Sequence, residues 1–332
     1  MDSWVGIDIS KDTFDAAWVT EDGELVHHKL DNDQKGFSKL LKVAPKDAKF
    51  VIESTGNYHL RCAFALFDAS RHVSVESPLA VKRHIQSDLK RSKNDKSDAI
   101  SLAKYGMAKN PSPWNPPSEE ALRARHILAL MDTIQKSLGF IRNNAHAFEQ
   151  VQLKSDFAVK ECRQLEKTLK AKLEILENEL EQVALAKWKE EIETIETIPG
   201  VGRATACQLM VKVEDFGRFK ISRQLISWTG LSPYNAQSGT SVNRHGGITR
   251  MGSERLRTQL YMCSISASRC CSDARRMWTR MKEKGKASKV AFIAIVNKIL
   301  RIAFALVRKH ETYKKDFVES LQKNHKILQL TP

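Results

Sequence analysis

The chain of 332 residues lacks the cysteine patterns that hold small domains together. Its six cysteines, at positions 62, 162, 207, 263, 270 and 271, include no CxxC pair and no paired histidine at metal-ligand spacing. This spacing argues against a zinc site and against a disulfide framework. We therefore expect buried free thiols.

Long apolar segments and an export signal are also missing. The longest apolar runs, such as VAFIAIV at 290–296, are much shorter than the roughly 20 residues that cross a bilayer. The chain passes from Met1 directly into a strand-like segment, without the basic region and apolar helix of a signal peptide. These absences predict a soluble, cytoplasmic protein without a membrane partner, and the length predicts two domains with separate cores.

Positive charge is present in excess. The net charge is +15 and the sequence pI is near 9.5. Residues 273–332 contain 15 Lys or Arg against 5 Asp or Glu, so net +10 lies in the last sixty residues. Solvated helix faces explain part of this excess, but its concentration at one end favours a phosphate-binding surface. We expect nucleic acid as the partner.

The first hundred residues alternate between strand and helix patterns. Strands are expected at 4–10, 13–19, 24–30, 49–55 and 72–77, and helices at 36–43, 60–69 and 96–108. Three successive strands, followed by strand and helix in alternation, indicate an α/β domain with a mixed sheet and helices on its faces. The proline-rich stretch NPSPWNPPS at 110–118 predicts an extended connector after this domain.

Helical periodicity dominates the chain from about residue 119 onwards. Apolar residues recur there at spacings of three and four, with Glu and Lys on the other faces. The stripe consists of Cys162, Leu165, Leu169, Leu173, Leu176, Leu180 and Val183. It predicts a helical hairpin or coiled coil that separates two domains and offers a subunit contact. The expected domains are 1–115, 116–192 and a mainly α-helical 193–332.

Four carboxylates of the first domain occupy unusual positions. Asp8 lies in the otherwise apolar strand VGIDIS, and Glu53 ends a second apolar strand, FVIEST. A carboxylate there is costly unless it finds donors or a cation. Asp95 and Asp98 begin a helix at a spacing that puts both on one face. Singly, each acid is explained as a cap or surface residue, but together they favour a site for Mg²⁺ or Mn²⁺.

These motifs resemble a known family. A mixed sheet with an acid on its first strand, another at the end of its fourth and a DxxD helix looks like a RuvC-like domain of the ribonuclease H fold. More closely, GIDISKDTFDAAWV, IESTGNYH and KNDKSDA resemble the DEDD-type insertion-sequence transposases described as bridge-RNA-guided recombinases. The resemblance implies that Asp8, Glu53, Asp95 and Asp98 form the catalytic metal-binding set.

The second domain begins with a helix-hairpin-helix pattern, IETIPGVGRATACQLM at 194–210. Gly200 and Gly202 would let DNA approach the free amides that start the second helix, with Arg203 beside them. A plain tight turn between two helices remains the alternative. We predict backbone contacts to nucleic acid that do not depend on base sequence.

A hydroxyl-rich stretch follows at 235–247, NAQSGTSVNRHGG. On the residues alone, such an Asn/Ser/Gly segment is more often a turn than a catalytic loop. A serine nucleophile needs activation, and the arginines downstream could neutralise a phosphate under attack. The basic residues concerned are Arg244, His245, Arg250, Arg255 and Arg257, of which the four arginines are predicted to bind nucleic acid.

The family resemblance extends to this stretch. TIPGVGRATA, ISWTGLSP and NAQSGTSV look like the C-terminal transposase domain of the same family, whose catalytic serine begins an SG step. The resemblance implies Ser238 as nucleophile, with Ser241 a weaker candidate. Tyr234 is a further hydroxyl, but its place beside Pro233 indicates packing or DNA contact.

The resemblance implies a prokaryotic, nucleoid-associated enzyme that cuts and rejoins donor and target DNA through a 5′-phosphoserine. A noncoding bridge RNA from the same element would guide it by base pairing. The protein would form a dimer that pairs into a tetramer. Two other functions stay open: a RuvC-like junction nuclease with an inert serine loop, and a non-catalytic nucleic-acid-binding protein.

Overall fold

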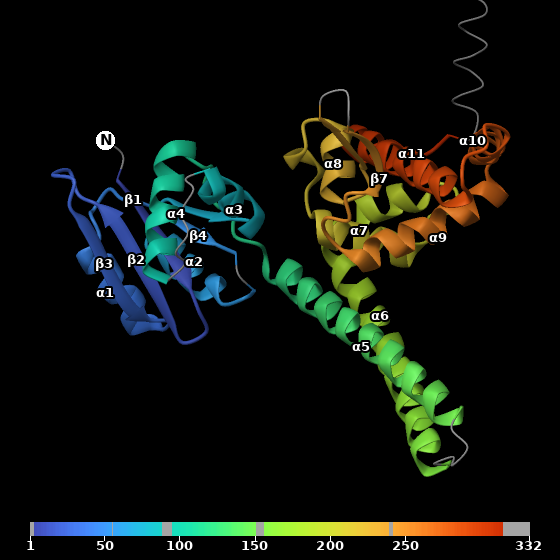
Figure 1. The fold of residues 1–332 in the computed structure, drawn as a ribbon, viewed down its shortest axis with the longest axis horizontal. Helices are drawn as coiled ribbons and strands as arrows, with labels where there is room; N and C mark the ends of the chain where they lie inside the picture. Colours follow the sequence, from blue (N-terminus) through green and yellow to red (C-terminus); the bar gives the residue numbers. More distant parts are fainter. Residues whose placement is uncertain (1–2, 55, 88–94, 151–155, 239–241, 315–332) are drawn as a thin grey trace, which may run out of the picture. The chain divides into compact units, whose positions relative to one another are not determined.

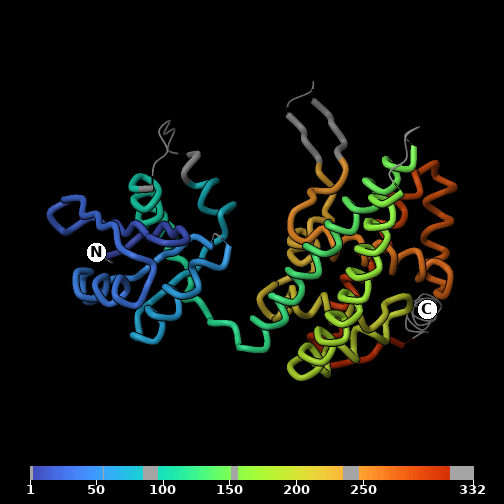
Figure 2. Tube along the Cα trace, turned by 90° about the horizontal axis from the view of Figure 1, so that it is seen from below, coloured from blue at the N-terminus to red at the C-terminus, as the bar shows by residue number. Residues whose placement is uncertain are grey.

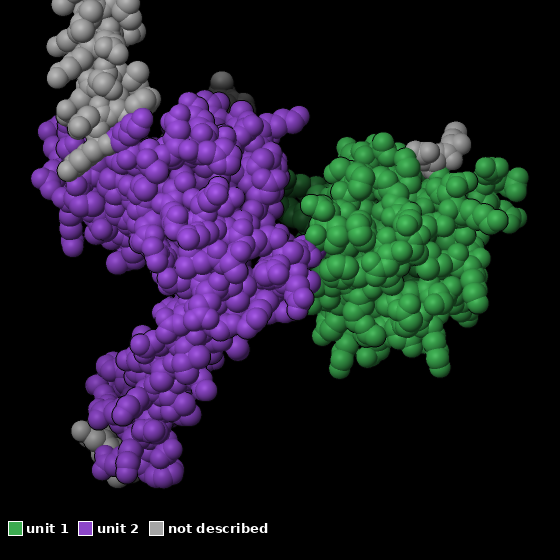
Figure 3. Space-filling model, turned by 180° about the vertical axis from the view of Figure 1, so that it is seen from behind, with its two compact units in different colours: residues 1–116 green, residues 117–332 purple. Residues whose placement is uncertain are grey.

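The computed structural model describes residues 3–54, 56–87, 95–150, 156–238 and 242–314. The chain divides into two compact units, which Figure 3 colours separately. We call Met1–Pro116 the N-terminal unit and Pro117–Pro332 the C-terminal unit.

A five-stranded mixed sheet forms the centre of the N-terminal unit (Figure 1). Its strands are β1 (Trp4–Ile9), β2 (Thr13–Val19), β3 (Leu25–Asp31), β4 (Lys49–Glu53) and β5 (Val73–Glu76), in the order β3-β2-β1-β4-β5. β1 runs antiparallel to β2 and parallel to β4, and β4 runs parallel to β5. The mixed α/β sheet expected from the sequence is therefore confirmed.

The helices of this unit are α1 (Gln34–Val43), α2 (His59–Asp68), α3 (Pro78–Ser87) and α4 (Asp95–Lys109). α3 was not expected, although its start carries a recognisable signal. Pro78 occupies the first helical position, and the Ser77 hydroxyl accepts a hydrogen bond from the Ala80 amide at 3.3 Å.

Alternation along the strands gives the sheet two apolar faces. Val5 and Ile7 of β1 and Ile52 of β4 belong to the larger core, with residues of α1 and α2. Trp4 and Val51 point to the other face and pack with Leu102 and Tyr105 of α4. Gly6 allows α4 to approach closely, because a Cβ there would lie 2.1 Å from the Ala99 carbonyl oxygen.

The proline-rich stretch is attached to the N-terminal unit. The Trp114 amide donates to the Val73 carbonyl at 2.6 Å, and the Trp114 ring packs edge-on against Phe64 and Phe67. The Ser74 hydroxyl donates to the Pro111 and Ser112 carbonyls. The expected connector is thus held against the edge strand β5.

A long helical hairpin begins the C-terminal unit. Its helices, α5 (Glu119–Glu149) and α6 (Asp156–Glu196), lie side by side in Figures 1 and 2. Of the predicted stripe, Leu173, Leu180 and Val183 are buried, whereas Leu165 is 51% exposed. Non-helical dihedral angles at Trp188 mark a kink in α6. Of the two predicted arrangements, the stripe therefore forms a helical hairpin within the chain.

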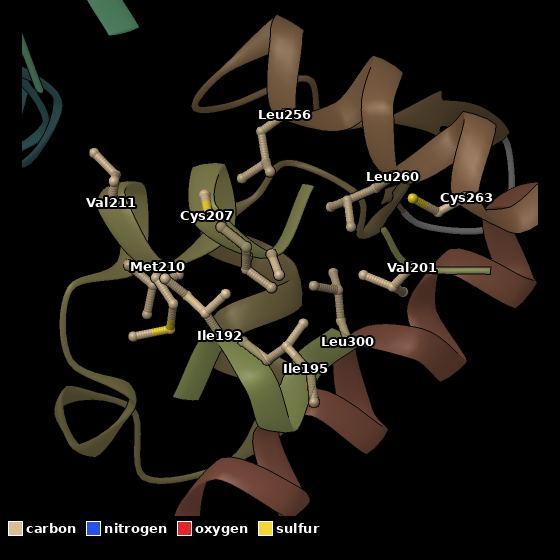
Figure 4. Packing of buried hydrophobic residues seen from close by; sticks show 14 of the residues in the cluster. Ile192, Ile195, Val201, Cys207, Met210, Val211, Leu256, Leu260, Cys263 and Leu300 are labelled. Atoms are coloured by element: carbon tan, nitrogen blue, oxygen red, sulfur yellow. The ribbon is translucent and has the colours of Figure 1, made fainter. Parts of the chain in front are cut away.

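The remaining elements pack around the end of α6. They are α7 (Arg203–Val213), the 3-10 turn Phe216–Arg218, α8 (Ser222–Trp228), β6 (Pro233–Ser238), β7 (Val242–Ile248), α9 (Glu254–Cys270), α10 (Ser272–Glu283) and α11 (Ser288–Lys309). Figure 4 shows their common core, where Ile192 and Ile195 of α6 meet Leu260 of α9 and Leu300 of α11.

Three sequence-based expectations need correction here. The stretch at 235–247 is largely the antiparallel hairpin β6–β7 and not an isolated turn, with residues 239–241 outside the described part. Two runs separated by three residues that include a glycine are typical of such a hairpin. All six cysteines are free, but only Cys62, Cys207 and Cys263 are buried, and Cys270 is exposed at the end of α9. The third correction concerns α11.

α11 extends well beyond the apolar run that is visible in the sequence. Its 22 residues are long and apolar enough to cross a membrane by length and composition. However, it packs against α6, α8, α9 and α10, and residues such as Ile295, Val296 and Leu300 are buried between them. One third of its most apolar window is buried, so packing in the C-terminal unit accounts for part of this apolar character.

Candidate functional site

Two of the predicted acids lie on neighbouring strands of the sheet. The parallel pairing of β1 and β4 aligns Gly6 with Val51 and Ile7 with Ile52, so the next aligned pair is Asp8 and Glu53. Residues two positions apart on a strand share a face. Asp8 and Glu53 therefore lie on the face that α4 covers, and both side chains are half-buried.

α4 brings the second acidic pair to this face. Ala99 and Leu102 of α4 are the residues that a Cβ on Gly6 would strike, which fixes the side of the helix turned to β1. Asp98 is half-buried and precedes Ala99 by one residue. Asp95 begins the helix, and its side chain lies outside the described part of the structure. The fold thus gathers three sequence-distant segments with acids on one face of the sheet.

Two further carboxylates are aligned with Asp8 and Glu53 in a row across the sheet, and neither was predicted from the sequence. Asp15 of β2 is aligned with Asp8 and is buried, with its Oδ1 2.7 Å from Nε2 of His27. Glu76 of β5 is aligned with Glu53. The segments TFDAAWV and HVSVES each place an acid in or at the end of an apolar strand, so the signal was present in the sequence.

Tyr105 of α4 connects the helix to the edge of this row. Its hydroxyl donates a hydrogen bond to Oε2 of Glu76 at 3.1 Å. Burial, the nearby Glu76 charge and this hydrogen bond raise the pKa of Tyr105 to about 12. The phenol therefore stays protonated near neutral pH and keeps donating to the carboxylate. This contact helps fix α4 on the sheet.

The chemistry of these side chains suits a hard divalent cation, which prefers carboxylate oxygens. Among the side chains that the structure describes, no group of three His, Cys, Asp or Glu lies close enough together to hold a metal ion. The ligand set of Asp8, Glu53, Asp95 and Asp98 therefore stays a prediction. What the fold provides is the common sheet face.

The predicted helix-hairpin-helix joins α6 to α7. Gly200 has φ +86°, and a Cβ there would lie 2.5 Å from the Ala267 amide of α9, so this glycine is required for packing. Gly202 caps α7 without a side-chain hydrogen bond, and nothing lies within 4 Å of its Cβ position. The first amides of α7 are thus free of a side-chain cap, as a phosphate contact would require.

The predicted basic residues differ in what they contact. Arg203 forms ion pairs with Glu196 and Glu181, and the hydrogen bond to Glu196 is the main reason why its pKa is raised. Arg255 is 13% exposed and donates to Gln208 and Glu177. Both side chains tie helices of the C-terminal unit together.

Arg250 and Arg257 lie nearer the β6–β7 hairpin. Arg257 donates to the Met251 carbonyl at 2.5 Å, which fixes its guanidinium. Arg250 is exposed, and no ion pair of its side chain is found among the described residues. Its φ of +56° is strained for a residue with a side chain. Arg244 lies on β7, but its side chain is outside the described part.

The candidate hydroxyls lie on or beside the hairpin. Ser238 is the last residue of β6 and pairs with Val242, but the direction of its side chain is not described. Ser241 lies outside the described residues. Tyr234 is 54% exposed on β6, which makes it a surface residue and not a packed one.

Comparison with known proteins assigns parts of both units to the same family. A DEDD transposase model of the IS110 type matches residues 5–138, and a model described as transposase IS116/IS110/IS902 family matches residues 192–279. Together they match about two thirds of the chain. The first match contains the acidic sheet face, and the second contains the β6–β7 hairpin. The chain belongs to the IS110/IS1111 family of DEDD transposases.

Relatives match this IS110-family chain over nearly its whole length. The pilin gene-inverting protein of Moraxella bovis is 29% identical over 322 residues, which cover 94% of this chain and 98% of that protein. The pilin gene-inverting protein of Moraxella lacunata has the same identity and coverage. The transposase for insertion sequence element IS1111A of Coxiella burnetii is 24% identical and covers 93% of this chain and 91% of its own length. The two family matches identify the chain as a transposase with a DEDD domain, which implies a divalent metal.

Proposed function

We propose that this transposase cuts and rejoins DNA through a 5′-phosphoserine intermediate at Ser238. The observation that carries the proposal is the pairing of two features in one chain. One unit has acids from three segments on a single sheet face, and the other has a hairpin whose β6 strand ends at Ser238. A junction nuclease would need only the first feature.

The covalent step conserves the energy of the DNA backbone. Ser238 loses its proton as its oxygen attacks the phosphorus, the bond to the 3′ oxygen breaks, and the leaving 3′ oxygen takes up a proton. The new phosphoserine ester stores the energy of the broken bond, so a 3′-hydroxyl from another strand can reverse the reaction without ATP.

The cationic side chains are assigned by what they contact. Arg244 on β7, whose pairing partner Ala236 lies two residues from Ser238, would neutralise the phosphate under attack. Arg250, at the base of the hairpin, would contact the DNA further along the strand, and the first amides of α7 beyond Gly202 would hold the DNA backbone. Arg203 and Arg255 are held by carboxylates, so we assign both of them to the stability of the unit.

The metal would be held by Asp8, Glu53, Asp95 and Asp98. Mg²⁺ or Mn²⁺ would stabilise charge on the reacting phosphate. The ion pair of Asp15 with His27 would hold the sheet face next to Asp8 in place. Glu76 would hold α4, and with it Asp98, through its hydrogen bond from Tyr105.

A guide RNA and a second subunit complete the proposal. Base pairing with a bridge RNA from the same element would select donor and target DNA, which frees the protein from reading bases. The protein would act as a dimer that pairs into a tetramer. The helical hairpin supports a subunit contact, because Phe140, Leu165 and Ile175 are each more than half exposed along it.

DNA inversion is a second candidate outcome of the same chemistry. The two Moraxella relatives are named as pilin gene-inverting proteins. Inversion and transposition differ in the arrangement of the exchanged sites, and both can use one covalent intermediate. The choice between them therefore depends on the DNA and leaves the proposed residue roles unchanged.

A denaturing-gel assay with element-end DNA, Mg²⁺ and the flanking noncoding RNA tests this proposal. The recombinase gives a DNA–protein adduct, a junction nuclease gives free cut ends, and a binding protein gives neither. Ser238→Ala should abolish the adduct and retain DNA binding, with Ser241→Ala as the matched control that keeps the adduct. Asp98→Asn should stop cleavage, and undiminished cleavage by that variant would refute the metal assignment.

A further inference from the structure

A hollow of about 660 Å³ lies beside the base of the β6–β7 hairpin, within the C-terminal unit. Its apolar lining residues, which we call the apolar floor, include Ile248 of β7, Tyr261 of α9, and Val290 and Ile293 of α11. Val290 is 50% exposed, and contact of its apolar side chain with water is unfavourable in free energy unless a ligand covers it. The volume is in the range of sites for small organic ligands.

Cationic residues line the same hollow. Arg250, Arg257 and Lys289 line the hollow, and Glu254 is the one carboxylate among its lining residues. The Arg257 guanidinium is held in place by the Met251 carbonyl. Lys289 is exposed, and its side chain has no ion pair among the described residues. A hollow lined by both apolar and cationic residues matches a ligand that has a flat apolar part and an anionic part.

The backbone that presents Arg250 is strained in a specific way. Arg250 has φ +56°, and its amide donates to the Gly230 carbonyl at 3.0 Å. A Cβ on Gly230 would lie 2.1 Å from the Met251 carbonyl oxygen, so the two loops are packed as closely as glycine allows. Strain of this kind persists only when the surroundings impose it, and it is common at ligand sites. The loop therefore holds Arg250 in the lining of the hollow.

The position along the hairpin indicates the source of the ligand. Pro233 and Ile248, which pair at the base of the hairpin, both line the hollow, and Ser238 lies five residues further along β6. Five strand residues span roughly 17 Å. This corresponds to about five nucleotide steps of 3.4 Å in B-form DNA.

We propose that the hollow binds an unstacked nucleotide of the DNA substrate, with its base on the apolar floor and its phosphate at Arg250 and Lys289. This inference rests on the proposed function, because it takes the DNA at Ser238 as the strand that supplies the nucleotide. Stacking against Tyr261 and apolar contact with Val290 would offset the loss of stacking in the duplex. The protein would thereby hold the strand in register close to the cleavage point.

Photocrosslinking of the full-length protein tests the proposal. The probe is a gapped DNA duplex with 5-iododeoxyuridine in its single-stranded gap, and the crosslinked peptide is identified by mass spectrometry. The crosslink should map to Tyr261 or to the start of α11. Val290→Glu should weaken binding of the gap about tenfold and remove this crosslink. Met262→Glu introduces the same charge at an exposed residue outside the hollow, and it should leave both unchanged.

Lys289→Ala provides a second variant that does not touch the apolar floor. It should weaken binding and lower the slope of log affinity against log salt by about 1, as expected for one lost phosphate contact. Crosslinks that map elsewhere, or that survive Val290→Glu, would overturn the proposal. Labelling of the hollow by a gap of 5-iodouridine RNA but not by the DNA gap would overturn DNA as the occupant.

The adduct assay separates this inference from the proposed function. If the hollow is labelled and no adduct forms on any DNA, the nucleotide site stands and the covalent mechanism fails. If adducts form at Ser238 and the hollow is never labelled, the mechanism stands and the nucleotide site fails.

Discussion

Gly6→Ala is the substitution that most directly perturbs the seating of α4 on the sheet. The new Cβ would lie 2.1 Å from the Ala99 carbonyl oxygen and 2.3 Å from the Ala103 amide, both of them backbone atoms. Ordinary contact begins near 3.4 Å, so α4 must withdraw by about 1 Å. Overpacking of this kind costs about 1–3 kcal/mol, partly offset by up to about 1 kcal/mol from a less flexible unfolded chain.

The same displacement should affect the reaction. A shift of about 1 Å in a catalytic group can lower a rate about 100-fold. Because Asp98 is on α4, we expect Gly6→Ala to reduce strand cleavage by about this factor while DNA binding by the C-terminal unit persists. Urea unfolding of the full chain and single-turnover cleavage measure the two effects.

Gly139→Ala is the matched control for stability. Gly139 lies inside α5, and nothing lies within 4 Å of its Cβ position. Alanine there should raise stability by about 0.5–1 kcal/mol, the opposite sign for the same chemical change. If Gly6→Ala matches the unsubstituted protein in both unfolding and cleavage, α4 is not packed on β1 as described, and the placement of Asp98 is refuted.

Two other substitutions test contacts between helices. Arg255→Ala should cost about 1.5–3 kcal/mol in urea unfolding, because it removes a mostly buried guanidinium that donates to Gln208, whereas the partner Glu177 is 50% exposed and can be solvated by water. Arg123→Ala, at a pair that is largely exposed, should cost under about 1 kcal/mol, and equal losses for both would contradict the structural role of Arg255. Tyr105→Phe concerns the phenol whose pKa is raised to about 12 in the folded chain from about 10 when unfolded. The protonated phenol contributes its full stabilisation of the folded chain below pH 10, and this stabilisation is lost as the pH rises from 10 to 12. The Tyr105→Phe variant has no phenol to titrate, so its free energy of unfolding should fall less than that of the parent protein across this pH range, as measured by circular dichroism.

Much of the N-terminal fold follows from local sequence. The strands of this unit are short apolar runs, and alternation within them decides which face each side chain joins. Asp8 and Glu53 could be selected because a carboxylate ends an apolar run. The sequence alone does not single out Asp15, because its importance depends on its alignment with Asp8 on the neighbouring strand. Strand alignment is a non-local property.

The C-terminal unit was less predictable for a similar reason. The charge of Arg255 is visible in the sequence, but the acids that surround it come from helices more than seventy residues away. The spacing that marks α9 as a helix cannot tell a DNA-binding arginine from one that joins helices. Likewise, the hollow beside β7 is lined by residues of four elements, β6, β7, α9 and α11, and has no sequence motif.

Mapping the residue that carries DNA is the most direct test of the central claim. The protein is incubated with element-end DNA, guide RNA and Mg²⁺, the trapped adduct is digested by nuclease and protease, and the modified peptide is sequenced by mass spectrometry. We predict a nucleotide joined through its 5′ phosphate to Ser238. A nucleotide on Tyr234 or Ser241, or cleaved DNA with no modified peptide, would contradict the account.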